Sequence, residues 1–388
     1  MRVASERILN RLGAAPAAML RAVCVALFVC VSGCGGGGDD AAPSSAMPTP
    51  APGTTQPPPA PALLVVGTAL SIDSGASGNP VGLRVARGAN GDGFAVWRAD
   101  DGTRHNLWAN RYRAATAAWG SPINIEASGT DIDDFDLTVD AGGNAVVAWH
   151  EVPADPLLST GTVMSARFDS GSGAWATPVP LSTDGREPRV ASDGTGAVLA
   201  VYVAVGGHVI RGRFFDPVSD TWQPEAAIEQ NNSGTGFSFG PTALLDGSGN
   251  ALAAWTNART GASIVASNYF SRSDGGWVFQ LAPDEFGLLG DVNGSFVLGS
   301  NSNVQLAATS GGDFLAAWQA TPFTDSEGNS EIRIARFTSA TRTWSEAQTL
   351  VPNSGQNIQL QRIGSDAGGN ALVLWTESVG HRDAEGIQ

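Results

Sequence analysis

The stretch Asn144 to Ser182, NAVVAWHEVPADPLLSTGTVMSARFDSGSGAWATPVPLS, contains the pattern that the rest of the chain repeats. One apolar run ends at Trp149, and a second run ends at Phe168 after a variable loop. A polar turn then leads to Trp175 and to a short run that contains proline. Short apolar runs separated by turns rich in Gly, Ser and Asp are typical of antiparallel β-strands. The stretch therefore predicts a repeat unit of four strands.

The two tryptophan positions of this stretch recur along the chain. The first is occupied in order by Trp97, Trp149, Tyr202, Trp255, Trp318 and Trp375, at intervals of 52 to 63 residues. The second is occupied by Trp119, Trp175, Trp222, Trp277 and Trp344. Periods of this size built from short strands are typical of β-propellers. The sequence thus predicts an all-β fold, a propeller of about six four-stranded blades.

In the second repeat we expect strands at about residues 135–140, 144–151, 161–168 and 178–182, labelled a to d. Strand b is almost continuously apolar, which predicts burial on both faces between neighbouring blades. The turn from a to b repeats as Asp140–Asn144, Asp246–Asn250 and Asp366–Asn370, in which Gly and Asn would supply the positive φ of a tight hairpin.

The third strands carry the motif Ala-Arg-Phe or a relative of it. Its copies are Asn110-Arg111-Tyr112, Ala166-Arg167-Phe168, Gly212-Arg213-Phe214, Ser267-Asn268-Tyr269 and Ala335-Arg336-Phe337. We expect the aromatic side chain to pack inward and the arginine stem to cover the outer face.

The turn from c to d, such as Ser271-Arg272-Ser273-Asp274-Gly275-Gly276-Trp277, resembles a degenerate Asp-box. The Asp-box is the Ser-x-Asp-x-Gly-x-Thr-Trp turn of sialidase-type propellers, and no copy here matches it fully. The resemblance implies the same propeller fold. In that family the box is structural, so it does not locate an active site.

Both ends of the repeat array bear on ring closure. Residues 68–73 resemble strand d, and an N-terminal strand d would complete the last blade and remove an open sheet edge. The last repeat has strands at about residues 360–365 and 370–377, and the chain stops at Gln388, where strand c is expected. We therefore expect the last blade to be incomplete in this chain, which is interpreted as truncated or a fragment.

Residues 1–33 are expected to be a signal peptide. Arg21 precedes the apolar run 22–31, which is too short to span a bilayer as a mature helix. Val31-Ser32-Gly33-Cys34 resembles the lipobox of bacterial lipoproteins, and this implies that Cys34 is lipidated and becomes the new N-terminus. The alternative is an ordinary signal peptide, and Met19 is an alternative start of the chain.

Residues 34–62 would form a disordered Gly- and Pro-rich tether, and residues 63–388 the propeller. The formal net charge is −15, so nucleic acid and anionic lipid are disfavoured as partners. Acyl chains on Cys34 would then hold the protein on the membrane. We expect a monomer in the cell envelope, at the outer membrane on its periplasmic or surface face.

Asp131, Asp133, Asp134 and Asp136 form the densest polar cluster of the sequence. Alternating carboxylates offer oxygen ligands to calcium, although their spacing does not match a calcium loop. Solvated loop charge is the interpretation we favour. The sequence indicates no other cofactor.

Aromatic residues outside the repeat positions are candidates for ligand contact. Phe237, Phe239, Phe286 and Phe296 lie in expected d–a loops and could anchor a protein partner, or they could pack on the blade tops. Trp108 could stack on a sugar or fill a gap between blades.

No catalytic residue is assigned. All three tyrosines occupy repeat core positions and the histidines are scattered, with no Cys, Ser or HExxH signature near them. The function predicted is a binding or scaffold module that uses the b–c and d–a loop face for a protein or glycan ligand. The alternative is a propeller glycoside hydrolase or lyase that uses loop carboxylates. Carboxylates clustered at the channel mouth with raised pKa values would favour the enzyme.

Overall fold

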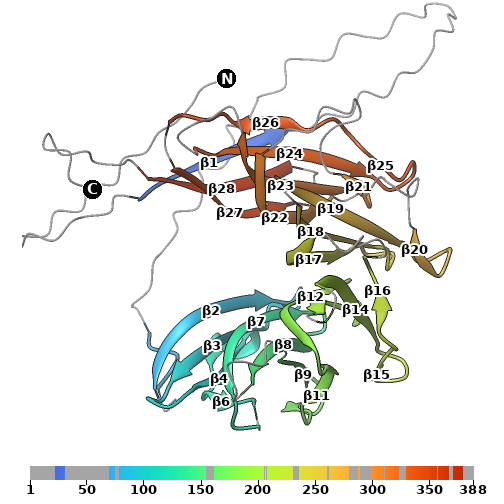
Figure 1. Ribbon diagram of the computed structural model, residues 1–388. Helices are drawn as coiled ribbons and strands as arrows, with labels where there is room; N and C mark the ends of the chain where they lie inside the picture. Colours follow the sequence, from blue (N-terminus) through green and yellow to red (C-terminus); the bar gives the residue numbers. More distant parts are fainter. Residues whose placement is uncertain are drawn as a thin grey trace, which may run out of the picture.

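The computed structural model is an array of antiparallel β-sheets with one short 3-10 helix, η1 (Ala114–Thr116), among the described residues (Figure 1). The structure describes residues 22–30, 70–74, 78–126, 128–153, 161–204, 206, 208–229, 236–259, 262–278, 287–288, 299–309, 311–322, 329–355, 357–366 and 370–378. No helix in these ranges is both long and apolar enough to cross a membrane.

Five of the six sheets share one topology, in which three long strands are followed by two short ones that both pair with the third strand. Sheet 1 contains β2 (Asn79–Arg87), β3 (Gly93–Asp100), β4 (His105–Arg113), β5 (Ala118–Trp119) and β6 (Ile123–Asn124). Sheet 2 contains β7 (Asp131–Val139), β8 (Ala145–Val152), β9 (Thr162–Asp169), β10 (Ala174–Trp175) and β11 (Val179–Ser182). Sheet 3 contains β12 (Gly185–Ser192), β13 (Val198–Ala204), β14 (Val209–Asp216), β15 (Thr221–Trp222) and β16 (Ala226–Ala227).

Sheets 4 and 5 repeat this order. Sheet 4 contains β17 (Phe237–Leu245), β18 (Ala251–Arg259), β19 (Ala262–Ser271), β20 (Gly276–Val278) and β21 (Gly287–Leu288). Sheet 5 contains β22 (Gly299–Ala308), β23 (Phe314–Pro322), β24 (Glu331–Thr338), β25 (Thr343–Trp344) and β26 (Gln348–Val351). The prediction of four-stranded antiparallel repeat units is confirmed, with the fourth strand divided into two short pieces.

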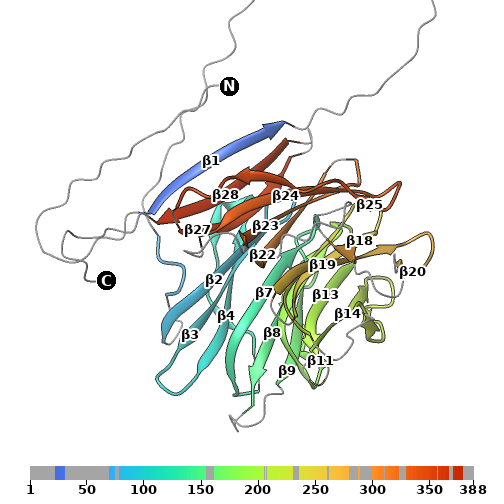
Figure 2. The same ribbon diagram turned by 45° about the horizontal axis from the view of Figure 1, so that its top comes forward.

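Sheet 6 differs in its third strand. It contains β27 (Asn357–Ser365) and β28 (Asn370–Ser378), and β28 pairs antiparallel with β1 (Ala22–Cys30) (Figure 2). The sequence assigns residues 22–30 to a signal peptide. A chain from which that segment has been removed cannot keep this strand, so β1 and a cleaved signal peptide exclude each other in one molecule.

The sheets stack in sequence order around a common inner edge. Their first strands contact one another successively, β2 with β7, β7 with β12, β12 with β17, β17 with β22 and β22 with β27. The short strands lie at the opposite, outer edge. This radial arrangement is propeller-like, and it places the first strand of every sheet on the inner edge.

Hydrophobic side chains hold successive sheets together. In sheets 2 to 6 the side chain at the first tryptophan position packs against the second strand of the preceding sheet. Trp149 lies in one cluster with Phe94 and Val96 of sheet 1. Tyr202, Trp255, Trp318 and Trp375 take the same place in the next four interfaces. Burial of the second strands on both faces, predicted from their unbroken apolar runs, follows from this packing.

The second tryptophan position pairs with an aromatic residue of the third strand. Phe168 lies opposite Trp175 in the ladder, and Phe337 lies opposite Trp344. In sheets 3 and 4 the partners are Phe215 and Phe270, one residue beyond the predicted Phe214 and Tyr269. The predicted motif is therefore shifted by one residue in these two sheets, because pairing to the tryptophan strand sets the register.

The turn between the first two strands is closed by a side-chain clamp. Asp140 accepts hydrogen bonds from the Asn144 backbone at 2.9 Å and from its side-chain amide at 2.7 Å. The Asn144 amide oxygen accepts a further bond, at 2.9 Å, from the backbone of Ser170 in the turn after the third strand. Positive φ falls on Gly143 and not on the asparagine. The asparagine thus links two turns, a role that the sequence did not indicate.

The residues before sheet 1 do not form the predicted strand, but they make one hydrogen bond that a preceding sheet makes elsewhere in the array. Leu70 to Asp73 is not a strand, but the Ile72 carbonyl accepts a 2.8 Å bond from the Asn110 side chain. Asn268 bonds the Ile228 carbonyl of sheet 3 at the same distance. On β2, Leu83 and Val85 remain 54% and 64% exposed, whereas Trp97 of β3 on the same face is buried, so only the β2 part of this face is open to solvent. The expected closing strand is therefore not seen here.

Truncating the sheet-to-sheet aromatic tests this packing. We expect Trp149→Ala to lower the free energy of unfolding by about 3 to 5 kcal/mol, because it leaves a large cavity between sheets 1 and 2. Urea titration followed by circular dichroism measures the change. Val218→Ala, at a side chain that is 94% exposed, is the control and should change stability by less than about 0.5 kcal/mol. Equal effects of the two substitutions would contradict this account of the fold.

Candidate functional site

The inner edge of the array carries a β-bulge in every sheet. The register shifts between Val81 and Leu83, Ile132 and Asp134, Arg186 and Arg189, Phe239 and Thr242, Ser302 and Gln305, and Leu360 and Arg362. A bulge leaves a residue unpaired and redirects its neighbours, and bulges are enriched next to functional sites. Charged side chains gather at the bulges of sheets 1 to 3. We call this group the inner-edge cluster, and its members are Arg84, Arg98, Asp134, Asp136, Arg186, Glu187 and Arg189.

The centre of the inner-edge cluster joins β7 to β12. Arg189 donates a 2.8 Å hydrogen bond to Asp134, and its side chain is 29% exposed. Asp136 accepts a 3.0 Å bond from the backbone of Val190 on the same strand as Arg189. Alternate residues of β7 thus direct two carboxylates toward one arginine of the next sheet.

Sheet 1 contributes two further arginines. The Arg84 Nε lies 3.8 Å from an Asp136 oxygen, and its guanidinium stacks over the Phe135 ring at 5.6 Å. Arg98 donates a 2.9 Å hydrogen bond to the Ile132 carbonyl, at the edge of the bulge. Asp136 therefore lies between arginines from the sheets on both sides of it.

Sheet 3 extends the cluster toward sheet 4. Glu187 has a φ of 54°, a left-handed conformation that disfavours a residue with a side chain. Its carboxylate accepts a 2.6 Å bond from the backbone of Gly240, the bulge residue of sheet 4. Arg186 lies 3.5 Å from the same carboxylate. This contact places β17, with Phe237 and Phe239 at its start, beside the cluster.

Burial raises the pKa of the Asp136 carboxyl above its ordinary value, against the attraction of Arg189 and Arg84 and the hydrogen bond from Val190. The side chain nevertheless remains 21% accessible. Asp134 and Asp136 conversely keep the pKa of Arg189 above its ordinary value, although burial opposes this.

The four aspartates of β7 do not converge. Asp131 bonds the His105 ring at 2.9 Å and Asp133 bonds the His150 ring at 2.7 Å, whereas Asp134 and Asp136 face Arg189. Within the described ranges no three His, Cys, Asp or Glu side chains form a group that could hold a metal ion. The geometry gives the calcium hypothesis no support, and the aspartates lie on a strand, where a loop was predicted.

His150 is a structural residue. Its side chain is 9% exposed, and a Cβ at Gly161 would lie 1.9 Å from its Nε2. The free side of the ring is therefore closed by the Gly161 backbone, and a glycine is required there. His105, which bonds Asp131, is 33% exposed, so its ring is accessible beside a carboxylate.

The predicted aromatic contacts have different outcomes. Phe237 is 57% exposed and packs edge-on against His208 at 4.7 Å, while Phe239 is half-buried. Trp108 lies opposite Trp97 on the uncovered side of sheet 1, where it is half-buried and packs with Trp97 and Ile72. Phe286, Phe296 and Cys34 lie outside the described residues.

The arginines and Glu187 of the cluster were not found from the sequence. No motif contains them, because they are brought together only by the bulges of three different sheets. One weak signal was available: Arg84 and Arg189 occur on first strands, at the position where sheets 4 and 5 have the uncharged residues Thr242 and Gln305.

Comparisons with known proteins support the fold. No protein-family model matches the sequence, and no curated protein matches it either. Among solved structures, an ulvan lyase from a new family of polysaccharide lyases is similar, with a TM-score of 0.51 and 11% identity over 78% of this chain and 82% of that one. The intramolecular trans-sialidase from Ruminococcus gnavus has a TM-score of 0.49 and 10% identity, over 81% and 97%. At these identities the likeness concerns the fold alone.

The raised pKa of Asp136 predicts a particular pH dependence of stability. The folded protein holds this proton at pH values where the unfolded chain has lost it, so wild-type stability falls as the pH rises through the folded pKa. Asp136→Asn removes the effect. We expect the variant to be more stable than wild type at about pH 7, with the difference vanishing below the ordinary pKa of about 3.9.

Asp92→Asn provides a control of opposite sign. Hydrogen bonds from the Ala114 backbone and the Arg111 side chain lower the pKa of Asp92, so its stabilisation is present at neutral pH and is lost on acidification. This variant should be less stable than wild type at about pH 7, with the loss shrinking as the pH falls. Urea unfolding across this pH range measures both differences. The same sign for the two variants would contradict the assignment.

Proposed function

We propose that this protein is a lipid-anchored β-propeller of about six blades that binds a glycan at its inner-edge cluster. The observation that carries the proposal is the alternation of Arg84, Asp136, Asp134 and Arg189 across three successive sheets, with side chains 21% to 37% exposed. Sugar hydroxyls both donate and accept hydrogen bonds. Carboxylates accept from them and guanidinium groups donate to them, so a mixed wall of both satisfies a polyol.

An apolar surface lies beside these polar groups. Phe237, at the start of β17, exposes more than half of its surface and is held against the His208 ring. A pyranose ring has an apolar C–H face that packs on aromatic rings, so a phenyl ring next to fixed polar groups suits a sugar better than a uniformly charged ligand. The ulvan lyase, which has a similar fold, acts on a polysaccharide.

Glycoside cleavage is the alternative that one observation favours. Asp136, whose pKa is raised, keeps its proton to higher pH than an ordinary carboxyl, as a general acid must. Turnover of a bound oligosaccharide that depends on Asp136 would establish the enzyme. Binding without turnover, retained in Asp136→Asn, would support a binding module.

The anchor is proposed at Cys34. The lipobox resemblance places this cysteine directly after the small residues Ser32 and Gly33, and the Gly- and Pro-rich residues 34–62 would hold the propeller away from the membrane. We propose that the protein acts as a monomer at the outer membrane, on its periplasmic or surface face.

Loss of one cluster arginine should weaken glycan binding. Arg189→Met keeps the aliphatic stem but removes the charge-assisted hydrogen bonds, each worth about 1.5 to 3 kcal/mol, so affinity should fall roughly ten- to hundredfold. A glycan array identifies ligands and calorimetry measures the affinities. The matched control is Arg342→Met, which breaks an ion pair of similar exposure in the outer turn of sheet 5. Unchanged binding in Arg189→Met would sink the proposal, and capture of a protein alone would favour a protein partner.

Lipidation can be tested separately. Metabolic labelling with an alkynyl fatty acid should label the wild-type protein in the membrane fraction, whereas Cys34→Ala should be unlabelled and absent from that fraction. Cys24→Ala and Cys30→Ala, in the segment expected to be removed, are the controls and should retain the label. Labelling that survives Cys34→Ala would refute the anchor.

A further inference from the structure

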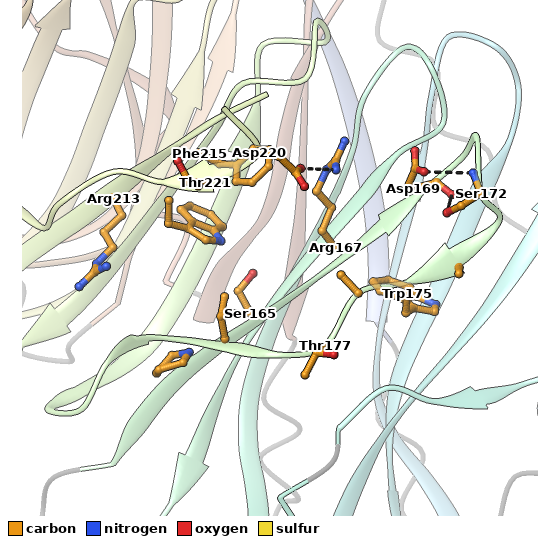
Figure 3. Close-up of a pocket in the computed structure, with 15 residues that line it drawn as sticks. Ser165, Arg167, Asp169, Ser172, Trp175, Thr177, Arg213, Phe215, Asp220 and Thr221 are labelled. Atoms are coloured by element: carbon orange, nitrogen blue, oxygen red, sulfur yellow. Dashed lines mark hydrogen bonds and ion pairs between the residues drawn. The ribbon is translucent and has the colours of Figure 1, made fainter. Parts of the chain in front are cut away.

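A cavity of about 530 Å³ lies between sheets 2 and 3 at the outer edge of the array (Figure 3). Its walls come from β9, β10 and β11 of sheet 2 and from β14 and β15 of sheet 3. None of these strands belongs to the inner-edge cluster, which lies on the first and second strands. The volume is within the range of pockets that hold small ligands.

The indole ring of Trp222 faces this lateral cavity, whereas the Trp175 ring lies on the other face of sheet 2, edge-on against Phe94 of sheet 1 at 5.5 Å. Trp222 packs edge-on against Phe215 with 5.5 Å between ring centroids. The Trp222 ring is therefore fixed by a phenylalanine of its own sheet before any ligand arrives. A fixed aromatic wall reduces the entropy lost on binding.

An ion pair connects the two sheets across the cavity. Arg167 of β9 lies 2.7 Å from Asp220 in the turn before β15, and its guanidinium stacks on Phe215 at 5.1 Å (Figure 3). Arg213 and Asp169 also line the cavity. Two arginines and two aspartates make the lining neutral in sum, within a chain whose net charge is −15.

Asp220 has a φ of 54°. The equivalent turn position has positive φ in sheets 1, 2, 4 and 5 as well, at Ala117 (49°), Gly173 (72°), Gly275 (69°) and Arg342 (58°). A side chain in the left-handed region carries a backbone cost that glycine avoids. Asp220 accepts that cost and places its carboxylate at the cavity, next to Arg167.

We propose that this lateral cavity binds a neutral hexopyranose unit of a glycan. The fixed indole of Trp222 provides a surface for the C–H face of the ring, while the paired Arg167 and Asp220, with the hydroxyls of Thr177 and Thr221, provide donors and acceptors for sugar hydroxyls. A neutral lining disfavours ligands of high charge of either sign. The site uses residues separate from the inner-edge cluster, so it does not depend on the function proposed for that cluster.

Filling the cavity is the direct test. Thr177 is exposed and lines the cavity, so Thr177→Trp introduces an indole without removing core packing. The probes are the neutral tetrasaccharides of glucose and mannose and the trisaccharide of N-acetylglucosamine, with binding measured by calorimetry and saturation-transfer NMR on the full chain. We expect at least one probe to bind wild type, and Thr177→Trp to weaken it at least about tenfold.

Two further variants separate this site from others. Asp220→Gly should leave the thermal midpoint unchanged or higher, since glycine suits φ of 54°, yet weaken the probe by removing the partner of Arg167. Arg342→Met, in the corresponding outer turn of sheet 5, should leave probe binding at the lateral cavity unchanged. Failure of every probe to bind wild type overturns the lateral site, as does binding that survives Thr177→Trp. Binding lost in Arg189→Met but kept in Thr177→Trp would place the sugar at the inner edge instead.

Discussion

The packing of one aromatic side chain per sheet against the sheet before it is the interaction on which the structure depends. Trp149, Trp255 and Trp318 are each almost fully buried, and each meets small or aliphatic residues of the preceding second strand. Because a sheet has two faces, a second strand must present its aromatic residue on one and small side chains on the other. Alternation within an unbroken apolar run satisfies both needs, which explains why these strands contain so many alanines.

The same constraint leaves the two ends of the array unequal to its middle. On sheet 1, Trp97 faces away from sheet 2 and packs only with its own strands and Ile72. On sheet 6, Leu374 points to the side where a following sheet would lie and is 37% exposed. These two faces carry the same kinds of residue as the interfaces inside the array. Sheet 1 presents an aromatic residue and sheet 6 an aliphatic one. Each uncovered face keeps apolar surface in contact with water, a cost that closure of the ring would remove.

Charged side chains gather where the sheets are least regular. The bulges of the first strands free backbone and side chains from the ladder, and the charged groups of sheets 1 to 3 gather there. The lateral cavity arises differently, from the gap between outer strands that diverge as the sheets fan out. In both places a residue with positive φ, Glu187 or Asp220, reaches across to the next sheet or the previous one. Strain carried by the backbone thus coincides with contacts between sheets.

The sequence by itself determined the repeat, the strand order and the buried tryptophan positions. These follow from the local pattern of apolar and polar residues and from the turn residues between strands, which do not depend on the neighbouring sheets. It misplaced the aromatic register of sheets 3 and 4 by one residue, since pairing between strands decides register. It also placed the β7 aspartates in a loop, and it missed the arginines that face them. Only the tertiary structure decided which charges meet. Arg84, Asp136 and Arg189 belong to three different sheets, and their spacing in the sequence does not tell how far apart they lie in space. The same holds for the lateral cavity, whose walls exist only once two sheets have packed.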